Sequence, residues 1–119
     1  MLSKTAIRTL ILLFSITMLT RETSAQMIPT GNDMILPCSR ALDEYIAPQI
    51  TMKAGQCVGI VQATFYLMDG SYFCAPKTAT IGQVIRIMNA YMQKNPKALH
   101  LSFPDLIRLE LLSMWPCRK

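Results

Sequence analysis

The four cysteines, at positions 38, 57, 74 and 117, are the residues of this sequence best suited to chemistry. Thiolates can attack a substrate, bind a metal ion or oxidise to disulfides. An even number of cysteines in a short chain with a secretory N-terminus is typical of a disulfide framework. A zinc site is the alternative, but the sequence has no Cys-x-x-Cys pair and His100 is its single histidine. We therefore expect two disulfides, no metal site and no cofactor.

Catalytic constellations are otherwise missing from the sequence. His100 has no free thiol to activate if all four cysteines are oxidised, and no Gly-x-Ser-x-Gly elbow is present for a serine nucleophile. We interpret His100 as a surface or half-packed ring. The carboxylates after residue 25 show no paired arrangement and are interpreted as helix caps and solvated side chains: Asp33, Asp43, Glu44, Asp69, Asp105 and Glu110. The sequence does not predict an enzyme.

Helices must position these residues. A first short helix is predicted over residues 33–42, capped by Gly31 or Asn32, with Pro37 expected to kink it or confine it to its first turn. Residues 43–51 form a connection. The segment 52–68 has many residues typical of strands, but its 17 residues favour a helix. Because that segment is apolar nearly all round, we expect the central, buried helix of the core, with most methionines filling that core.

Two further helices follow an Asp-Gly turn at residues 69–70. Residues 80–94 repeat apolar side chains at helical spacing and begin with a capping box of Thr80 and Gln83. After a loop at residues 95–101, the last helix runs from Ser102 to about Met114 and is apolar over more than one stripe. The fold class is therefore all-α, a small disulfide-stapled bundle of about four helices. The broad apolar surface of the last helix indicates self-association.

The N-terminus has the three parts of a secretory signal peptide. Lys4 and Arg8 precede the apolar residues 9–20, and small residues end the segment at Ala25. We expect cleavage after Ala25, which leaves residues 26–119 as one domain. The alternative is an uncleaved anchor, but a span requires about 20 apolar residues. The mature part carries nine Lys or Arg against six Asp or Glu, a net charge of +3 without a basic cluster. Nucleic acid is therefore not expected as a partner, nor stable membrane insertion after cleavage.

The cysteine pairing follows from the expected bundle, although four cysteines allow three connectivities. If the last two helices are antiparallel, the end of the last returns to the start of the third and brings Cys117 near Cys74. The first helix similarly lies against the first half of the second, which brings Cys38 near Cys57. These bonds close loops of about 44 and about 20 residues, and each contributes about 3–4 kcal/mol by the chain-entropy model.

The order of five short blocks resembles a known family. The blocks are 30-TGNDMILPC-38, 55-GQCVGI-60, 74-CAP-76, 95-NPKALH-100 and 115-WPC-117. They are similar to the small exported immunity proteins of the Rap/Tai type, which protect bacteria against peptidoglycan amidases delivered by type VI secretion. This resemblance implies an α-helical periplasmic protein, often a homodimer, that binds a cognate amidase and occludes its catalytic cleft.

A rigid loop between helices suits an inhibitor because little conformational freedom is lost on binding. The candidate is the loop at residues 94–100, supported by the polar face of the third helix. The expected toxin-binding residues are Arg86, Asn89, Gln93, Lys94, Lys97 and His100. A different function, a small periplasmic helical chaperone or stress protein that exposes apolar surface, also fits the sequence.

Overall fold

The computed structural model describes residues 27–43 and 52–118. These residues form the helices α2 (Gly31–Ala41), α3 (Met52–Met68), α4 (Ile81–Lys94) and α5 (Phe103–Met114), with a short 3-10 helix, η2 (Pro96–Ala98), before α5. The predicted small all-α bundle is confirmed. The predicted signal peptide and most of the connection at residues 43–51 lie outside the described residues.

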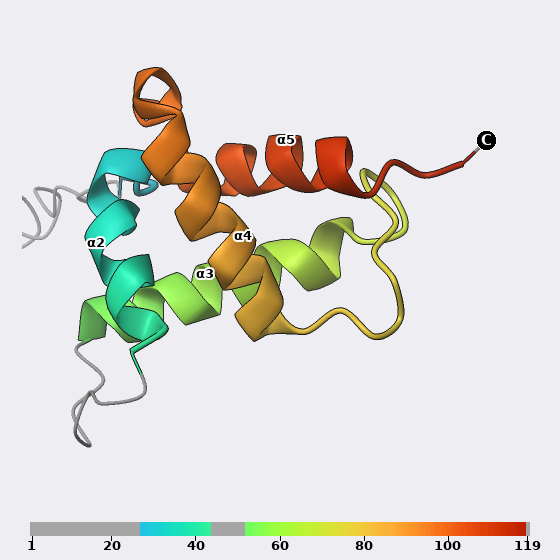
Figure 1. Cartoon of the computed structure of the whole chain (residues 1–119), viewed down its shortest axis with the longest axis horizontal. Coiled ribbons are helices and arrows are strands. Elements are labelled where there is room, and N and C mark those ends of the chain that lie inside the picture. The colour runs from blue at the N-terminus through green and yellow to red at the C-terminus, as the bar shows by residue number, and fades with distance from the viewer. Residues whose placement is uncertain (1–26, 44–51, 119) are drawn as a thin grey trace, which may run out of the picture.

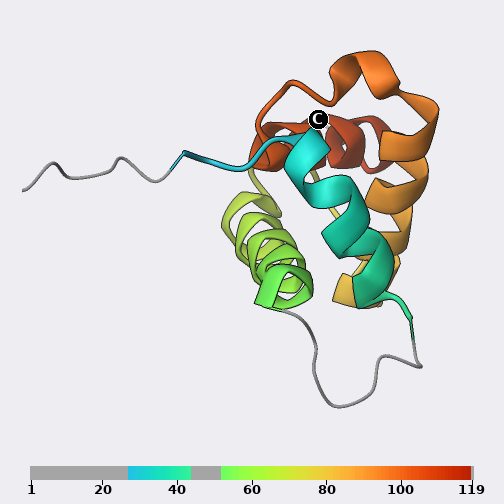
Figure 2. The ribbon, with the colours of Figure 1, turned by 90° about the vertical axis from the view of Figure 1, so that its left-hand side faces the viewer.

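The helices cross rather than stand as an up-and-down bundle. α3 and α5 lie against each other and run in the same direction, while α2 and α4 run in opposite directions across them (Figure 1; Figure 2). The expected antiparallel pairing of the last two helices is therefore wrong. The long stretch between α3 and α4 allows α4 to turn away and cross the pair, so α5 packs beside α3.

The N-cap of α2 is Thr30, not Gly31 or Asn32 as the sequence predicts, and the helix begins at Gly31, two residues before the predicted start. The Asp33 carboxylate accepts hydrogen bonds of 2.8 Å from both the backbone N–H and the hydroxyl of Thr30. The next two backbone N–H groups are satisfied from another part of the chain, because Gly31 donates to the Leu101 carbonyl (3.1 Å) and Asn32 to the Leu99 carbonyl (3.0 Å). Exposed helix-start donors need such partners. The first turn of α2 is thus fixed by the segment before α5.

This cap makes stability depend on pH. The backbone N–H and hydroxyl of Thr30 lower the pKa of the Asp33 carboxyl. A depressed carboxyl pKa contributes stability above the unfolded pKa, and that contribution is lost as pH falls through the folded pKa. We expect melting temperature to fall less steeply from about pH 5 to pH 3 in Asp33→Asn than in the wild-type chain. Asp43→Asn, an exposed carboxylate beyond the same helix, is the control and should retain the wild-type slope.

Pro37 does not confine α2 to its first turn, which is one of the two effects expected from the sequence. The proline lies inside the helix and is buried with Met34 and Cys38, on the face that α2 turns to the core. Proline at this position removes one backbone donor. Burial of its ring and of its neighbours offsets that loss, and the helix continues to Ala41.

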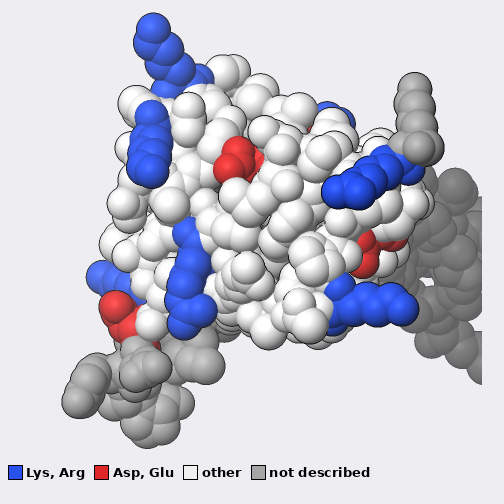
Figure 3. Space-filling model, turned by 45° about the vertical axis from the view of Figure 1, so that its right-hand side comes forward, with Lys and Arg blue, Asp and Glu red and all other residues white. Residues whose placement is uncertain are grey.

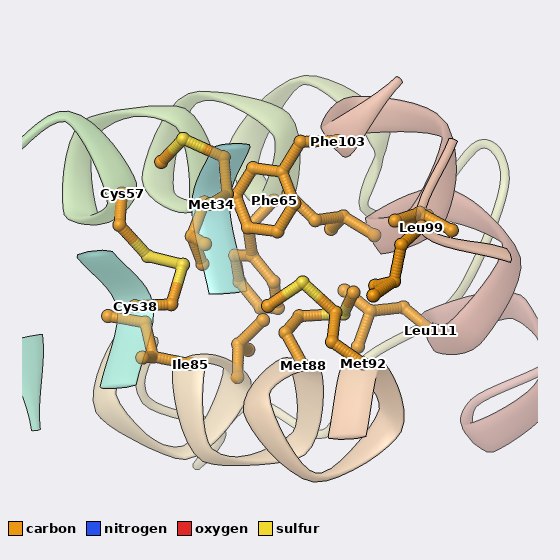
Figure 4. Close-up of a cluster of buried hydrophobic side chains, with 14 of the residues drawn as sticks. Met34, Cys38, Cys57, Phe65, Ile85, Met88, Met92, Leu99, Phe103 and Leu111 are labelled. Carbon is orange, nitrogen blue, oxygen red and sulfur yellow. A yellow bond between two sulfur atoms is a disulfide. The ribbon is translucent and has the colours of Figure 1, made fainter. Parts of the chain in front are cut away.

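The core lies between the four helices. Met34, Phe65, Met88, Met92 and Phe103 point toward one another from different helices (Figure 4). The expectation that α3 is buried all round is wrong: its buried side chains lie on one face, while Tyr66 is 67% and Leu67 79% exposed. Met52 and Met114 are likewise exposed and do not fill the core. Apolar composition alone cannot separate a buried helix from one that leaves an apolar face uncovered.

Local signals set the remaining boundaries. Gly70 has a φ of +82°, the left-handed conformation that ends α3 in a turn, and its N–H donates to the Phe73 carbonyl (2.7 Å). The Thr80 hydroxyl accepts from the Gln83 backbone N–H (3.2 Å) and caps α4 at the predicted residue, which is one of the two bonds of the predicted capping box. The Ser102 hydroxyl accepts from the Asp105 backbone N–H (3.3 Å) and begins α5.

Both expected disulfides are present. Cys38–Cys57 joins α2 to α3 with both cysteines fully buried, and Cys74–Cys117 joins the chain beyond α3 to the chain beyond α5. The second bond forms because the parallel α3 and α5 end at the same side of the molecule, where the Cys74 N–H also donates to the Trp115 carbonyl (2.8 Å). Its pairing is therefore right for a reason other than the one expected.

No helix in the described ranges is long and apolar enough to cross a membrane. Within the same residues, no cluster of three or more His, Cys, Asp or Glu side chains could hold a metal ion.

Candidate functional site

The loop between α4 and α5 is built as a rigid projection. The Asn95 side-chain amide donates to the Tyr91 carbonyl (2.9 Å) and ends α4, and η2 follows at once. Leu99, only 8% exposed, anchors the loop in the core, and its carbonyl accepts from Asn32 of α2. Lys97 and His100 remain exposed on either side of this anchor. The loop therefore presents polar side chains on a backbone tied to the bundle.

His100 is part of the same turn. Its Nδ1 lies 2.8 Å from the Lys97 carbonyl oxygen, a hydrogen bond in which the ring N–H donates. This contact holds the imidazole against the loop backbone and leaves the ring exposed. The interpretation of His100 as a surface residue is confirmed.

A groove lies beside this loop, between α4 and α5, and we name it the α4–α5 groove. It has a volume of about 440 Å³. Its lining residues are Arg86, Ile87, Ala90, Tyr91, Lys94, Asn95, Glu110 and Met114. On the face drawn in Figure 3, lysine and arginine side chains are spread singly over a mostly uncharged surface, with few acidic side chains among them. The groove thus combines an apolar floor with a few separate charges.

Glu110 is the acidic residue of this groove. Partial burial raises the pKa of its carboxyl above the ordinary value, because desolvation disfavours the charged form. Glu110 is therefore only partly solvated, whereas its interpretation from the sequence is a helix cap or a solvated side chain. The other carboxylates that the structure describes include two helix caps, Asp33 and Asp105, and Asp69, which accepts from the Ala75 N–H (2.9 Å).

The six expected toxin-binding residues fall into three groups. Arg86 and Lys94 line the α4–α5 groove, and Lys97 and His100 lie on the loop. Gln93 is exposed on α4. Asn89 is half-buried, and its side-chain oxygen is buried without a hydrogen-bond partner among the described residues. A partner that covers the loop and the groove together would contact four of the six.

Sequence reasoning missed the α5 side of the groove. Glu110 and Met114 lie four residues apart and therefore on one face of α5. The sequence shows that spacing, but nothing in the sequence shows that α4 packs on that face of α5. Ile87 and Ala90 were similarly indistinguishable from core positions.

The sequence blocks can now be compared with known families. A family model of Rap1a immunity proteins matches residues 30–117. This chain belongs to the Rap1a immunity protein family. A search of curated proteins and a search of solved structures both found no match.

The match spans all four described helices, so the whole bundle is the Rap1a immunity domain. The blocks quoted for the resemblance have structural roles in it. The first block begins with Thr-Gly-Asn at the start of α2, and its Cys38 pairs with Cys57 of the second block in the buried disulfide. The third and last blocks contain Cys74 and Cys117, which form the outer disulfide. The Asn-Pro block forms the loop with η2. Four of the five blocks therefore build the Rap1a scaffold, whereas the Asn-Pro block lies in the loop that carries the exposed Lys97 and His100.

Proposed function

We propose that this Rap1a immunity protein is a periplasmic inhibitor of a peptidoglycan amidase toxin delivered by type VI secretion. It binds the toxin and occludes the catalytic cleft. The single observation that carries this proposal is the family match over residues 30–117, which identifies an immunity protein. An immunity protein acts by binding, so we assign it no catalytic residue and no cofactor.

The compartment is supported by the chain's chemistry. Disulfides persist in oxidising compartments such as the bacterial periplasm, and all four cysteines are paired. Residues 1–25 have the sequence of a signal peptide that is removed on export. A toxin that attacks peptidoglycan would be met in the same compartment.

The loop at residues 94–100 is the proposed plug for the cleft. Its backbone is fixed by the buried Leu99 and by the hydrogen bonds to α2, so little conformational entropy is lost when it enters a cleft. Lys97 and His100 are exposed and able to contact catalytic-site groups. Arg86, Asn89, Gln93 and Lys94 of α4 would support this contact.

Replacing Lys97 and His100 together by alanine should weaken inhibition. The two side chains lie at the tip of the plug, and loss of two central interface contacts typically costs about 2 kcal/mol or more, which is a more than about twentyfold increase in Kd. The measurement is calorimetric Kd for the cognate amidase, with peptidoglycan hydrolysis followed in parallel. Lys77→Ala, in the exposed loop before α4, is the control. Unchanged affinity of the double variant would exclude this loop as the plug.

A chaperone is the second candidate because large apolar side chains are exposed on α3, on α5 and between α3 and α4. Tyr66, Leu67 and Tyr72 are more than half exposed, and Leu112 is 40% exposed. Capture from periplasmic extract on the immobilised oxidised chain separates the two functions. One stoichiometric amidase supports the immunity protein, whereas many unfolded clients support the chaperone.

The same exposed apolar side chains support a homodimer. Exposed apolar patches on small proteins commonly mark interfaces, and Leu67 and Leu112 lie on the two helices that run side by side. Sedimentation of the oxidised chain over a concentration series is the test. A monomer at every concentration would remove this proposal.

A further inference from the structure

The turn that carries His100 is held on both sides by the first turn of α2. Gly31 donates its backbone N–H to the Leu101 carbonyl (3.1 Å), and Asn32 donates its own to the Leu99 carbonyl (3.0 Å). These two carbonyls belong to the residues directly after and before His100. Both donors are helix-start N–H groups, which have no acceptor inside their own helix. The backbone on either side of His100 is therefore clamped by α2.

The clamp depends on a close approach of the two backbones. A Cβ on Gly31 would lie 3.0 Å from the Leu99 Cα, so a side chain there would force the loop away from α2. An antiparallel β-bridge between Thr30 and Ser102 continues the contact toward the start of α5. The segment that begins α2 and the segment that follows the loop thus form one backbone unit.

Two side chains fix the direction of the donors in this unit. The Asp33 carboxylate accepts hydrogen bonds of 2.8 Å from both the backbone N–H and the hydroxyl of Thr30. These bonds hold Thr30 as the N-cap, and the N-cap conformation aims the N–H groups of the two residues that follow it. Asp33 itself is exposed. Its influence on the loop therefore passes through Thr30 and the backbone of the first helical turn.

A loop released from α2 would be a weaker plug. An interface segment that is not already held in its bound conformation must be ordered on binding, and this entropic cost is subtracted from the affinity. Lys97 and His100 are joined within the loop, because the His100 Nδ1 lies 2.8 Å from the Lys97 carbonyl oxygen. Both residues therefore move with the backbone that α2 holds.

We propose that Thr30 and Asp33 are positioning residues for inhibition of the amidase. Together they aim the first turn of α2 at the carbonyls on either side of His100 and hold the plug in its binding conformation. This inference rests on the proposed function, because it takes the loop at residues 94–100 as the plug. It adds to that function two residues that act through the loop.

Amide hydrogen exchange of the oxidised chain, followed by NMR, tests the clamp without a partner. Asp33→Ala removes the acceptor of both Thr30 bonds and should speed exchange at least about tenfold at Asn32 in α2 and at Leu101 beyond the loop. Asp33→Asn keeps a side-chain oxygen and should restore slower exchange, and Asp43→Ala, at an exposed carboxylate beyond α2, should exchange as wild type. Unchanged exchange in the middle of α4 shows that the variants stay folded. Faster exchange at Asn32 with wild-type exchange at Leu101 would overturn the proposal.

A double-mutant cycle measures the positioning in the complex. The probe is the amidase that the immobilised oxidised chain captures from periplasmic extract, and Kd is measured by calorimetry. Asp33→Ala should raise Kd about tenfold in the wild-type chain. It should raise Kd less than about twofold in the chain that already carries Lys97→Ala and His100→Ala, because the displaced loop then has little contact left to lose. Asp33→Asn should bind within about threefold of wild type.

The outcomes separate this inference from the proposed function. Equal factors for Asp33→Ala in the two backgrounds would overturn the positioning role, since Asp33 would then act independently of the loop, and would leave the proposed function intact. If the wild-type chain binds no amidase, the proposed function fails, and hydrogen exchange alone decides whether Asp33 holds the loop.

Discussion

Replacing Cys38 and Cys57 together by alanine is expected to leave much of the domain unfolded at about 37 °C. The disulfide closes a loop with a sequence separation of 19 residues, worth about 3 kcal/mol by chain entropy. Both cysteines also pack in the hydrophobic core, where each is 0% exposed to solvent. Their removal therefore adds the cost of two small cavities, about 1 kcal/mol each. A total near 5 kcal/mol is comparable with the whole stability of many small domains.

The outer disulfide provides the matched control. Cys74→Ala with Cys117→Ala opens a longer loop, with a separation of 43 residues, which chain entropy alone values at about 4 kcal/mol. Cys74 is exposed and Cys117 half-exposed, so no cavity cost is added. Urea unfolding of the two double variants gives both free energies. If the outer double variant lost more unfolding free energy than the buried one, chain entropy and not core packing would determine which disulfide stabilises the domain more.

Replacing Gly31 by valine is expected to destabilise the domain by about 2–3 kcal/mol. A Cβ at this position would lie 2.6 Å from Leu106 Cδ1 and 3.0 Å from the Leu99 Cα. Leu106 is 0% exposed and the Leu99 backbone is held by its hydrogen bond to Asn32, so neither can move away without loss. Gly31→Ala should cost less, about 1–2 kcal/mol.

Gly59 is the matched control, because its replacement by alanine should change the free energy of unfolding in the opposite direction. It lies on the exposed side of α3, and a Cβ there meets no atom within 4 Å. Gly59→Ala should therefore stabilise the domain by up to about 1 kcal/mol through helix propensity. Urea unfolding of Gly31→Ala and Gly59→Ala measures both. Two changes of the same sign would contradict the close packing of α2 on the segment before α5.

The sequence by itself determined the helices and the disulfides. Apolar spacing and cap residues located α4 and α5 nearly to the residue, because those signals are local: Thr80 and Ser102 each bond a donor three residues on. Four cysteines in a short chain predicted two bonds, and the resemblance of short blocks over residues 30–117 predicted the family. These properties depend on neighbours in the chain or on residue identity alone.

Only the tertiary structure decided how the helices meet. The start of α2 at Thr30 depends on Leu99 and Leu101, about seventy residues later, and the exposed face of α3 depends on where α2, α4 and α5 leave it uncovered. The α4–α5 groove exists because α4 crosses α5, and no local pattern encodes a crossing. The physical reason is that side-chain burial and charge pairing are set by contacts between segments distant in sequence. The sequence thus specified the immunity scaffold, whereas packing decided which of its charges line the α4–α5 groove.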